Sequence, residues 1–179
     1  MNALATPMCS HITNVGTTLI ELLVTIGIAA MFAAVTLFNA QDWAYQNRRS
    51  DYIEQLYTHL FAARSYAIFN NHYVSVCPAI AERCVPNWQN NIMVFVDNNN
   101  DKQRGGDEPI LNILTVPIGN DTIDYPRRAV TFKPTGALGG FQSGSFVYCS
   151  VEDKLNQPAY RITVSQTGRL RIKQDSDKC

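Results

Sequence analysis

The sequence predicts an α+β protein in which one long amino-terminal helix packs on a carboxyl-terminal antiparallel β-sheet domain. Three observations support this prediction. Residues 16–38 form an apolar run with a single charged residue, Glu21. The following stretch, residues 39–70, contains no proline or glycine and carries apolar residues at helical spacing. After Asn71 the hydrophobic period changes to two, which is typical of β-strands.

The apolar run is long enough to cross a membrane as a helix. Leu22 to Phe38 are 17 residues without an ionisable side chain, and a helix of that length spans about 25 Å. With its flanks, the run approaches the thickness of a bilayer core. An unpaired carboxylate in hydrocarbon costs several kcal/mol, so Glu21 needs a partner. Cleavage after Gly16 would supply one, the new α-amino group of Thr17, four residues before Glu21.

The motif Gly16-Thr-Thr-Leu-Ile-Glu21, followed by Leu-Leu-Val, resembles the type IV prepilin signature. The resemblance implies that a prepilin peptidase cleaves between Gly16 and Thr17 and methylates the new amino terminus. It also implies that Glu21 neutralises the Thr17 amine of a neighbouring subunit during assembly. Two features depart from the family: Thr17 replaces the usual Phe, and residues 1–16 contain no Lys or Arg. An ordinary signal anchor is the alternative interpretation.

The resemblance divides the chain into four segments. Residues 1–16 are the leader, which starts at Met1 or Met8, and residues 17–39 are the membrane and assembly half of the helix. Residues 40–71 are its amphipathic half, and residues 72–179 are the globular β domain. The implied location is the inner membrane, crossed once, with the carboxyl-terminal domain in the periplasm and later at the pilus or cell surface. The implied partners are other pilins and the pilus assembly machinery.

The amphipathic half of the helix has one continuous apolar stripe. Its members recur at offsets of three and four residues, which places them on one helix face; they are Ile53, Leu56, Leu60, Ala63 and Ala67. Asn70-Asn71 is a suitable helix stop. Strands are then expected at 73–77, 91–97, 109–116, 129–133, 145–149, 160–164 and 169–173. The strand at 91–97 is dense enough in apolar residues to be buried on both faces, and the last two strands form a hairpin around residues 165–168.

Four cysteines lie beyond the membrane segment, and Cys9 lies in the leader. In an oxidising compartment four cysteines favour two disulfides, with three possible connectivities. The short spacing favours Cys77–Cys84, and Cys149 would then pair with Cys179. Zinc is disfavoured because there is no Cys-x-x-Cys motif and the histidines are not at ligand spacing. We expect neither a metal nor another cofactor.

Charge is distributed unevenly although the net charge is zero. Residues 17–124 contain six Lys or Arg and eleven Asp or Glu, whereas residues 125–179 contain nine and four. In the last predicted strand the cations Arg169, Arg171 and Lys173 alternate with apolar residues. Strand periodicity places the three cations on one face, at about 6.6–6.8 Å intervals, near the phosphate spacing of an extended nucleic-acid strand. This pattern favours an anionic partner, and a solvated edge strand is the alternative.

Several motifs together resemble the FimT/GspH-type minor pilins. They are Ala63-Arg-Ser65, the Val-x-Val-Cys-Pro segment that contains Cys77, a following Trp, Val-Phe-Val-Asp97 and the closing Thr-Gly-Arg-Leu-Arg171. In the FimT branch the Gly-Arg-x-Arg element is associated with DNA binding during natural transformation. The resemblance therefore implies non-specific binding of double-stranded DNA by Arg169 and Arg171, with Lys173 as an extension. Four further cations are expected to enlarge the patch, namely Arg161, Arg127, Arg128 and Lys133. The alternative is a structural pseudopilin of a pilus or type II secretion pseudopilus without a DNA ligand.

A second, weaker candidate site is the acidic stretch that begins at Asp97. Four residues match positions 1, 3, 5 and 12 of a calcium-binding loop; they are Asp97, Asn99, Asp101 and Glu108. Lys102 occupies the position that such loops reserve for glycine, so a polar turn between strands is the alternative. No catalytic motif is present: Gly-x-Ser-x-Gly and His-Glu-x-x-His are both absent, so we do not expect an enzyme.

Overall fold

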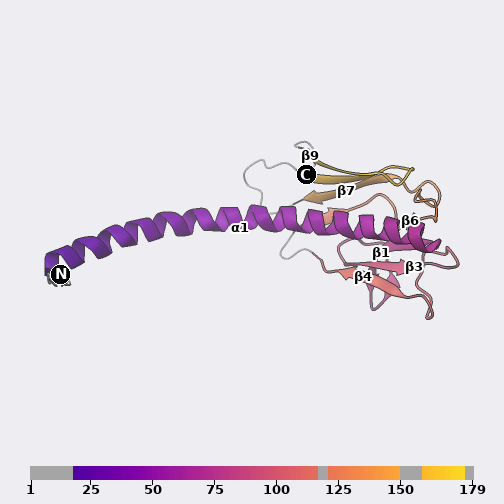
Figure 1. Ribbon diagram of the computed structural model, residues 1–179, viewed down its shortest axis with the longest axis horizontal. Helices are drawn as coiled ribbons and strands as arrows, with labels where there is room; N and C mark the ends of the chain where they lie inside the picture. Colours follow the sequence, from indigo (N-terminus) through magenta and orange to yellow (C-terminus); the bar gives the residue numbers. More distant parts are fainter. Residues whose placement is uncertain (1–17, 117–120, 150–158, 176–179) are drawn as a thin grey trace, which may run out of the picture. The chain divides into compact units, whose positions relative to one another are not determined.

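Figure 1 shows the computed structural model, which describes residues 18–116, 121–149 and 159–175. The chain forms two compact units, residues 1–46 (the first unit) and residues 47–179 (the second unit). Helix α1 (Leu19–Asn70) contributes residues to both units, and it is one helix of 52 residues, as the sequence predicts.

The first unit contains the apolar start of α1. Leu19–Leu37 is 19 residues long, has a mean hydropathy of 2.2 and is not buried within the protein. Among the described residues it is the one helix long and apolar enough to cross a membrane. Thr18 precedes the helix, and its Oγ1 accepts a hydrogen bond from the Glu21 backbone N–H at 3.4 Å. Thr-x-x-Glu at this position is the capping-box pattern, which stabilises a helix start.

In the second unit, α1 buries the stripe that its sequence predicts. Each member of the stripe is at most 1% exposed; these are Ile53, Leu56, Leu60, Ala63 and Ala67. The helix ends at Asn70, and Asn71 adopts the left-handed conformation with φ 56°. The His72 N–H donates to the Ala67 carbonyl at 3.3 Å, so a helix-terminal carbonyl is satisfied there.

Nine strands in the described residues form two antiparallel sheets (Figure 1). The first sheet has β2, β1, β3 and β4 in that order, with β6 also paired to β1. Its strands are β1 (Val74–Ile80), β2 (Arg83–Cys84), β3 (Asn91–Val96), β4 (Ile110–Leu114) and β6 (Val130–Phe132). The second sheet has the order β5-β7-β8-β9. Its strands are β5 (Thr122–Asp124), β7 (Gly144–Cys149), β8 (Ala159–Val164) and β9 (Leu170–Asp175).

The sequence prediction found seven of the nine described strands and missed β2 and β5. β2 has two residues, and the three residues of β5 include a single apolar side chain, so neither shows a period of two. The division into two sheets was not predicted, because strand pairing depends on partners that are distant in sequence. β3 is buried along five of its six positions, which confirms the expectation that both of its faces are covered.

The main core lies where α1 meets both sheets. Trp88 belongs to this core, is 2% exposed, and makes edge-on ring contacts with Tyr125 and Phe146. The Trp88 Nε1–H donates to the Arg127 carbonyl at 2.7 Å, so this buried indole is satisfied. A smaller cluster fills the other face of the first sheet; its members are Cys77, Met93, Phe95 and Ala129.

Candidate nucleic-acid interface

Strand β9 is the edge of the second sheet and carries the predicted cations on one face. Arg171 is paired with Thr163 and Lys173 with Arg161, whereas Leu170 pairs with the buried Val164. Successive side chains of a strand lie on opposite faces. Arg169, just before the strand, and the two cations within it are all exposed. The three predicted cations therefore form an exposed row along the edge strand.

Arg161 of β8 extends this row across to the neighbouring strand. It is half-buried and lies directly opposite Lys173. Directly paired residues of antiparallel strands have Cβ atoms about 4.5–5.5 Å apart. The four cations Arg161, Arg169, Arg171 and Lys173, here called the cationic face, thus lie together on the outer side of the β8–β9 hairpin.

The hairpin turn depends on a glycine at position 168. Gly168 has φ +75°, which favours glycine, and its N–H donates to the Ser165 carbonyl at 2.8 Å. A Cβ atom built at Gly168 would lie 1.9 Å from the carbonyl oxygen of Gly136. The turn before Arg169 therefore packs against the backbone of the turn at Gly136, with no room for a side chain.

Helix α1 fixes the position of both turns through Arg64. The Arg64 Nε–H donates to the Gly136 carbonyl at 3.0 Å. The Leu138 N–H donates to the Gln166 carbonyl at 3.0 Å, a second link between the two turns. Sequence reasoning did not find this contact, although Arg64 and Gly168 both belong to motifs that carry the family resemblance. Their 104-residue separation in the chain, from 64 to 168, gives no local signal.

Two of the further cations, Lys133 and Arg127, belong to loops that are linked to the hairpin turn by contacts and hydrogen bonds. The backbone N–H of Lys133 donates to the Ala137 carbonyl, within the turn that touches Gly168. Arg127 is exposed, and its Nε–H donates to the Phe141 carbonyl at 3.1 Å. The loop at Phe141 is itself hydrogen-bonded to the hairpin turn, because the side-chain amide Nε2 of Gln166 donates to the Gly140 carbonyl.

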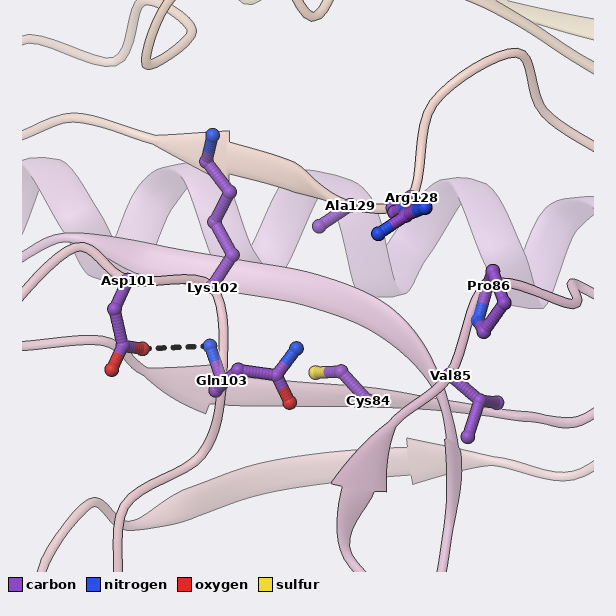
Figure 2. A pocket seen from close by; sticks show the side chains of 8 residues that line it. All are labelled: Cys84, Val85, Pro86, Asp101, Lys102, Gln103, Arg128 and Ala129. Carbon is purple, nitrogen blue, oxygen red and sulfur yellow. Dashed lines mark hydrogen bonds between the residues drawn. The ribbon is translucent and has the colours of Figure 1, made fainter.

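Arg128 lies in a different setting. It lines a pocket of about 260 Å³ on the first sheet, beside Lys102 and the disulfide residue Cys84 (Figure 2). The pocket is smaller than the cavities of about 300–1,000 Å³ that usually hold small ligands. Because β9 belongs to the second sheet, we do not count Arg128 in the cationic face.

The acidic stretch from Asp97 forms a self-satisfied polar turn. The Asp97 carboxylate accepts hydrogen bonds from Ser75 Oγ at 2.6 Å and from the backbone N–H groups of Asp101 and Lys102, each at 3.1 Å. Glu108 accepts from the N–H groups of Asn98 and Gly105. Within the described part of the chain no cluster of three or more His, Cys, Asp or Glu side chains is arranged to hold a metal ion. These hydrogen bonds hold the stretch as a polar turn.

Burial governs the ionisation of Asp97. Its side chain is 0% exposed, and this burial raises the pKa of the carboxyl above its usual value. The hydrogen bonds from Ser75 and the loop N–H groups lower the pKa and offset part of this effect.

One disulfide is formed within the described residues. Cys77 of β1 is bonded to Cys84 of β2, with Cα atoms 5.6 Å apart, as the sequence spacing favours. Cys179 lies outside the described residues, so its pairing with Cys149 stays a prediction. Gly16 and Thr17 also lie outside them, and cleavage there stays a prediction.

Comparison with known proteins assigns the family. Residues 53–168, more than half of the chain, match the family model described as Type II transport protein GspH. The chain belongs to the GspH family. No match was found among curated proteins.

Solved structures of GspH-like proteins share the fold. The type IV minor pilin FimU of Pseudomonas aeruginosa is 17% identical, with a TM-score of 0.58 over 76% of this chain and 95% of FimU. A second crystal form of FimU gives 18% identity, a TM-score of 0.54, and coverage of 72% and 94%. The minor pseudopilin EpsH of the Vibrio cholerae type 2 secretion system is 13% identical, with a TM-score of 0.51 over 71% of this chain and 97% of EpsH. The chain therefore has a minor pilin or pseudopilin fold, as the sequence predicts.

Proposed function

We propose that this minor pilin or pseudopilin binds double-stranded DNA without sequence preference through the cationic face, for DNA uptake in natural transformation. The observation that carries the proposal is the exposed row Arg169, Arg171 and Lys173 on an edge strand. Like charges on one strand face repel each other, and a polyanion lying along the row converts that repulsion into attraction.

The proposed binding is electrostatic. The one helix in the described residues is α1, and its membrane-length start and buried stripe leave no recognition helix for a DNA groove. With about four phosphate contacts, the logarithm of affinity should fall with the logarithm of salt concentration at a slope of about −3.6. A single subunit then binds with a dissociation constant of about 10⁻⁴–10⁻⁶ M, and several subunits on one fibre gain by avidity.

A charge-matched pair of variants tests the proposal. Arg169→Gln with Arg171→Gln removes two charges from the cationic face, and Arg83→Gln with Lys102→Gln removes two exposed charges from β2 and the β3–β4 loop. The hairpin variant should lose retardation of duplex DNA and lose transformation, while it still enters pili. The variant Arg83→Gln with Lys102→Gln should behave like the wild type. Equal DNA binding by both variants would refute the assignment to β9.

A second candidate function is structural, in pilus or pseudopilus initiation without DNA. The match to a type II transport family and the fold of EpsH favour it. Both functions require the same assembly step: a prepilin peptidase cleaves after Gly16 and methylates Thr17, and Glu21 pairs with a neighbouring amine. The apolar helix then leaves a single-pass position in the inner membrane for the fibre, and the second unit moves from the periplasm to the surface.

The capping box makes a sharp test of Glu21 possible. Gln also suits the third capping-box position, so Glu21→Gln keeps the helix start and removes only the charge. We expect the variant to be processed normally, which mass spectrometry of the mature amino terminus checks, and to be lost from sheared fibres. Normal incorporation would show that the carboxylate serves only the helix cap.

A further inference from the structure

A fully exposed phenylalanine lies in a loop that is hydrogen-bonded to the turn of the β8–β9 hairpin. Phe141 is 94% exposed, the highest value among the large apolar side chains that the structure describes. It lies between β6 and β7, in the segment Gly139-Gly-Phe-Gln-Ser143. Its phenyl ring contributes nothing to either core cluster, so the fold does not account for it.

The loop that presents Phe141 is held firmly. Three consecutive carbonyls, those of residues 140–142, each accept a hydrogen bond from a side chain. The donors are Gln166 Nε2 to Gly140, Arg127 Nε to Phe141 at 3.1 Å, and Tyr125 Oη to Gln142 at 2.6 Å. The buried Gln142 side chain in turn accepts from the Thr131 N–H at 2.7 Å. Because the backbone at Phe141 is held in place, the loop loses little conformational freedom when the ring binds a partner.

The charges around the ring indicate which partner it fits. Arg127 hydrogen-bonds the Phe141 carbonyl, so a guanidinium lies next to the ring's own backbone. On the other side, Gln166 precedes Arg169 by three residues, a distance of at most about 10 Å along the chain. The backbone that carries the ring is thus hydrogen-bonded to Arg127 and to the hairpin turn that precedes Arg169. Its neighbours in the chain are glycine, glutamine and serine, so no second large apolar side chain adjoins it in the segment.

We propose that Phe141 is a stacking platform for an unpaired DNA base and that it gives the protein a preference for single-stranded over duplex DNA. Aromatic rings beside a basic surface bind single strands in this way, because every base has a π-face and the phosphates follow the cations. In a duplex the bases are already stacked, so the ring gains nothing there. This inference rests on the proposed binding of DNA by the cationic face and adds to it a tighter binding of single strands than of duplexes.

The test compares full-length protein in detergent binding to a labelled oligothymidylate and to a duplex of the same length, by fluorescence anisotropy. Phe141→Ala and Phe141→Leu should weaken single-strand binding by about fivefold or more and change duplex binding by less than about twofold. Phe141→Tyr should retain wild-type affinity, because it keeps the aromatic face. Phe61→Ala, which removes another exposed phenyl ring from α1, is the matched control and should change neither affinity.

A spectroscopic variant adds a direct readout. Phe141→Trp places an indole at the loop tip, and base stacking should quench its emission when the oligothymidylate binds. The native Trp43 and Trp88 of the wild-type protein provide the background.

The outcomes separate this inference from the proposed function. If Phe141→Ala binds the single strand normally while Arg169→Gln with Arg171→Gln weakens both DNA forms, the stacking inference is wrong and the proposed function stands. If the wild type binds neither form, the proposed function is wrong and the inference falls with it. Normal DNA binding by Phe141→Ala together with loss from assembled fibres would identify a protein partner instead, and would also overturn the inference.

Discussion

The two sheets of the second unit differ in what lies on their outer faces. The outer face of the first sheet is covered by its own small cluster, which includes Met93 and Phe95 and also the disulfide residue Cys77. The outer face of the second sheet ends in the exposed cations of β9. Apolar side chains on the first sheet are therefore required for stability, whereas the exposed cations Arg171 and Lys173 of β9 belong to neither core cluster.

The largest expected effect comes from the covered face. Phe95 is 0% exposed, and Phe95→Ala should lower the free energy of unfolding by about 3–5 kcal/mol. Arg171→Gln on the exposed face should change it by less than about 0.5 kcal/mol. Urea unfolding of the full chain in detergent measures both. Similar losses for the two variants would show that the β9 cations are structural.

The disulfide should stabilise the first sheet without affecting DNA binding. It closes a short loop with a sequence separation of 7, and the chain-entropy relation assigns such a loop about 2.5 kcal/mol. We expect Cys77→Ser with Cys84→Ser to lower the unfolding free energy by that amount and to keep wild-type duplex affinity. A fall in affinity as large as that of the hairpin variant would mean that the two sheets are not independent.

The hairpin turn at Gly168 affects both the stability of the fold and the position of the cationic face. Gly168→Ala places a Cβ atom against the Gly136 carbonyl and should cost about 1–3 kcal/mol while displacing Arg169. Gly140→Ala is the control, because Gly140 also has a positive φ, +103°, but a Cβ atom there meets nothing within 4 Å. Equal losses of stability in urea unfolding would show that only the backbone conformation matters, and not the close approach to Gly136.

The smallest effect is a pH dependence that comes from Asp97. Burial raises the pKa of its carboxyl in the folded protein, so between the ordinary and the raised pKa the unfolded chain ionises first. The stability contribution of the protonated carboxyl is therefore present at low pH and is lost as pH rises through that interval. Asp97→Asn should remove this component from the pH profile of unfolding. An unchanged profile would assign it to other groups.

The sequence predicted the features that depend on local periodicity. The buried stripe of α1, the double burial of β3 and the alternation of Arg169, Arg171 and Lys173 all follow from spacing within one element. The Cys77–Cys84 disulfide follows from proximity along the chain.

Features that join distant segments were not predicted. The contact of Arg64 with the Gly136 turn and the packing of that turn on Gly168 depend on three elements that only folding brings together. The same holds for Phe141, whose loop is fixed by Tyr125, Arg127 and Gln166. A phenylalanine set among glycines and polar residues was the one local signal for it.

The most direct test of the central claim is the salt dependence of duplex affinity for the wild type and for Arg169→Gln with Arg171→Gln. If the outer face of the second sheet contacts phosphates, the wild-type slope should be about −3.6 and the variant slope about −1.8, because two contacts are lost. The same slope in both proteins would contradict the account, since it would place the DNA contacts elsewhere on the molecule.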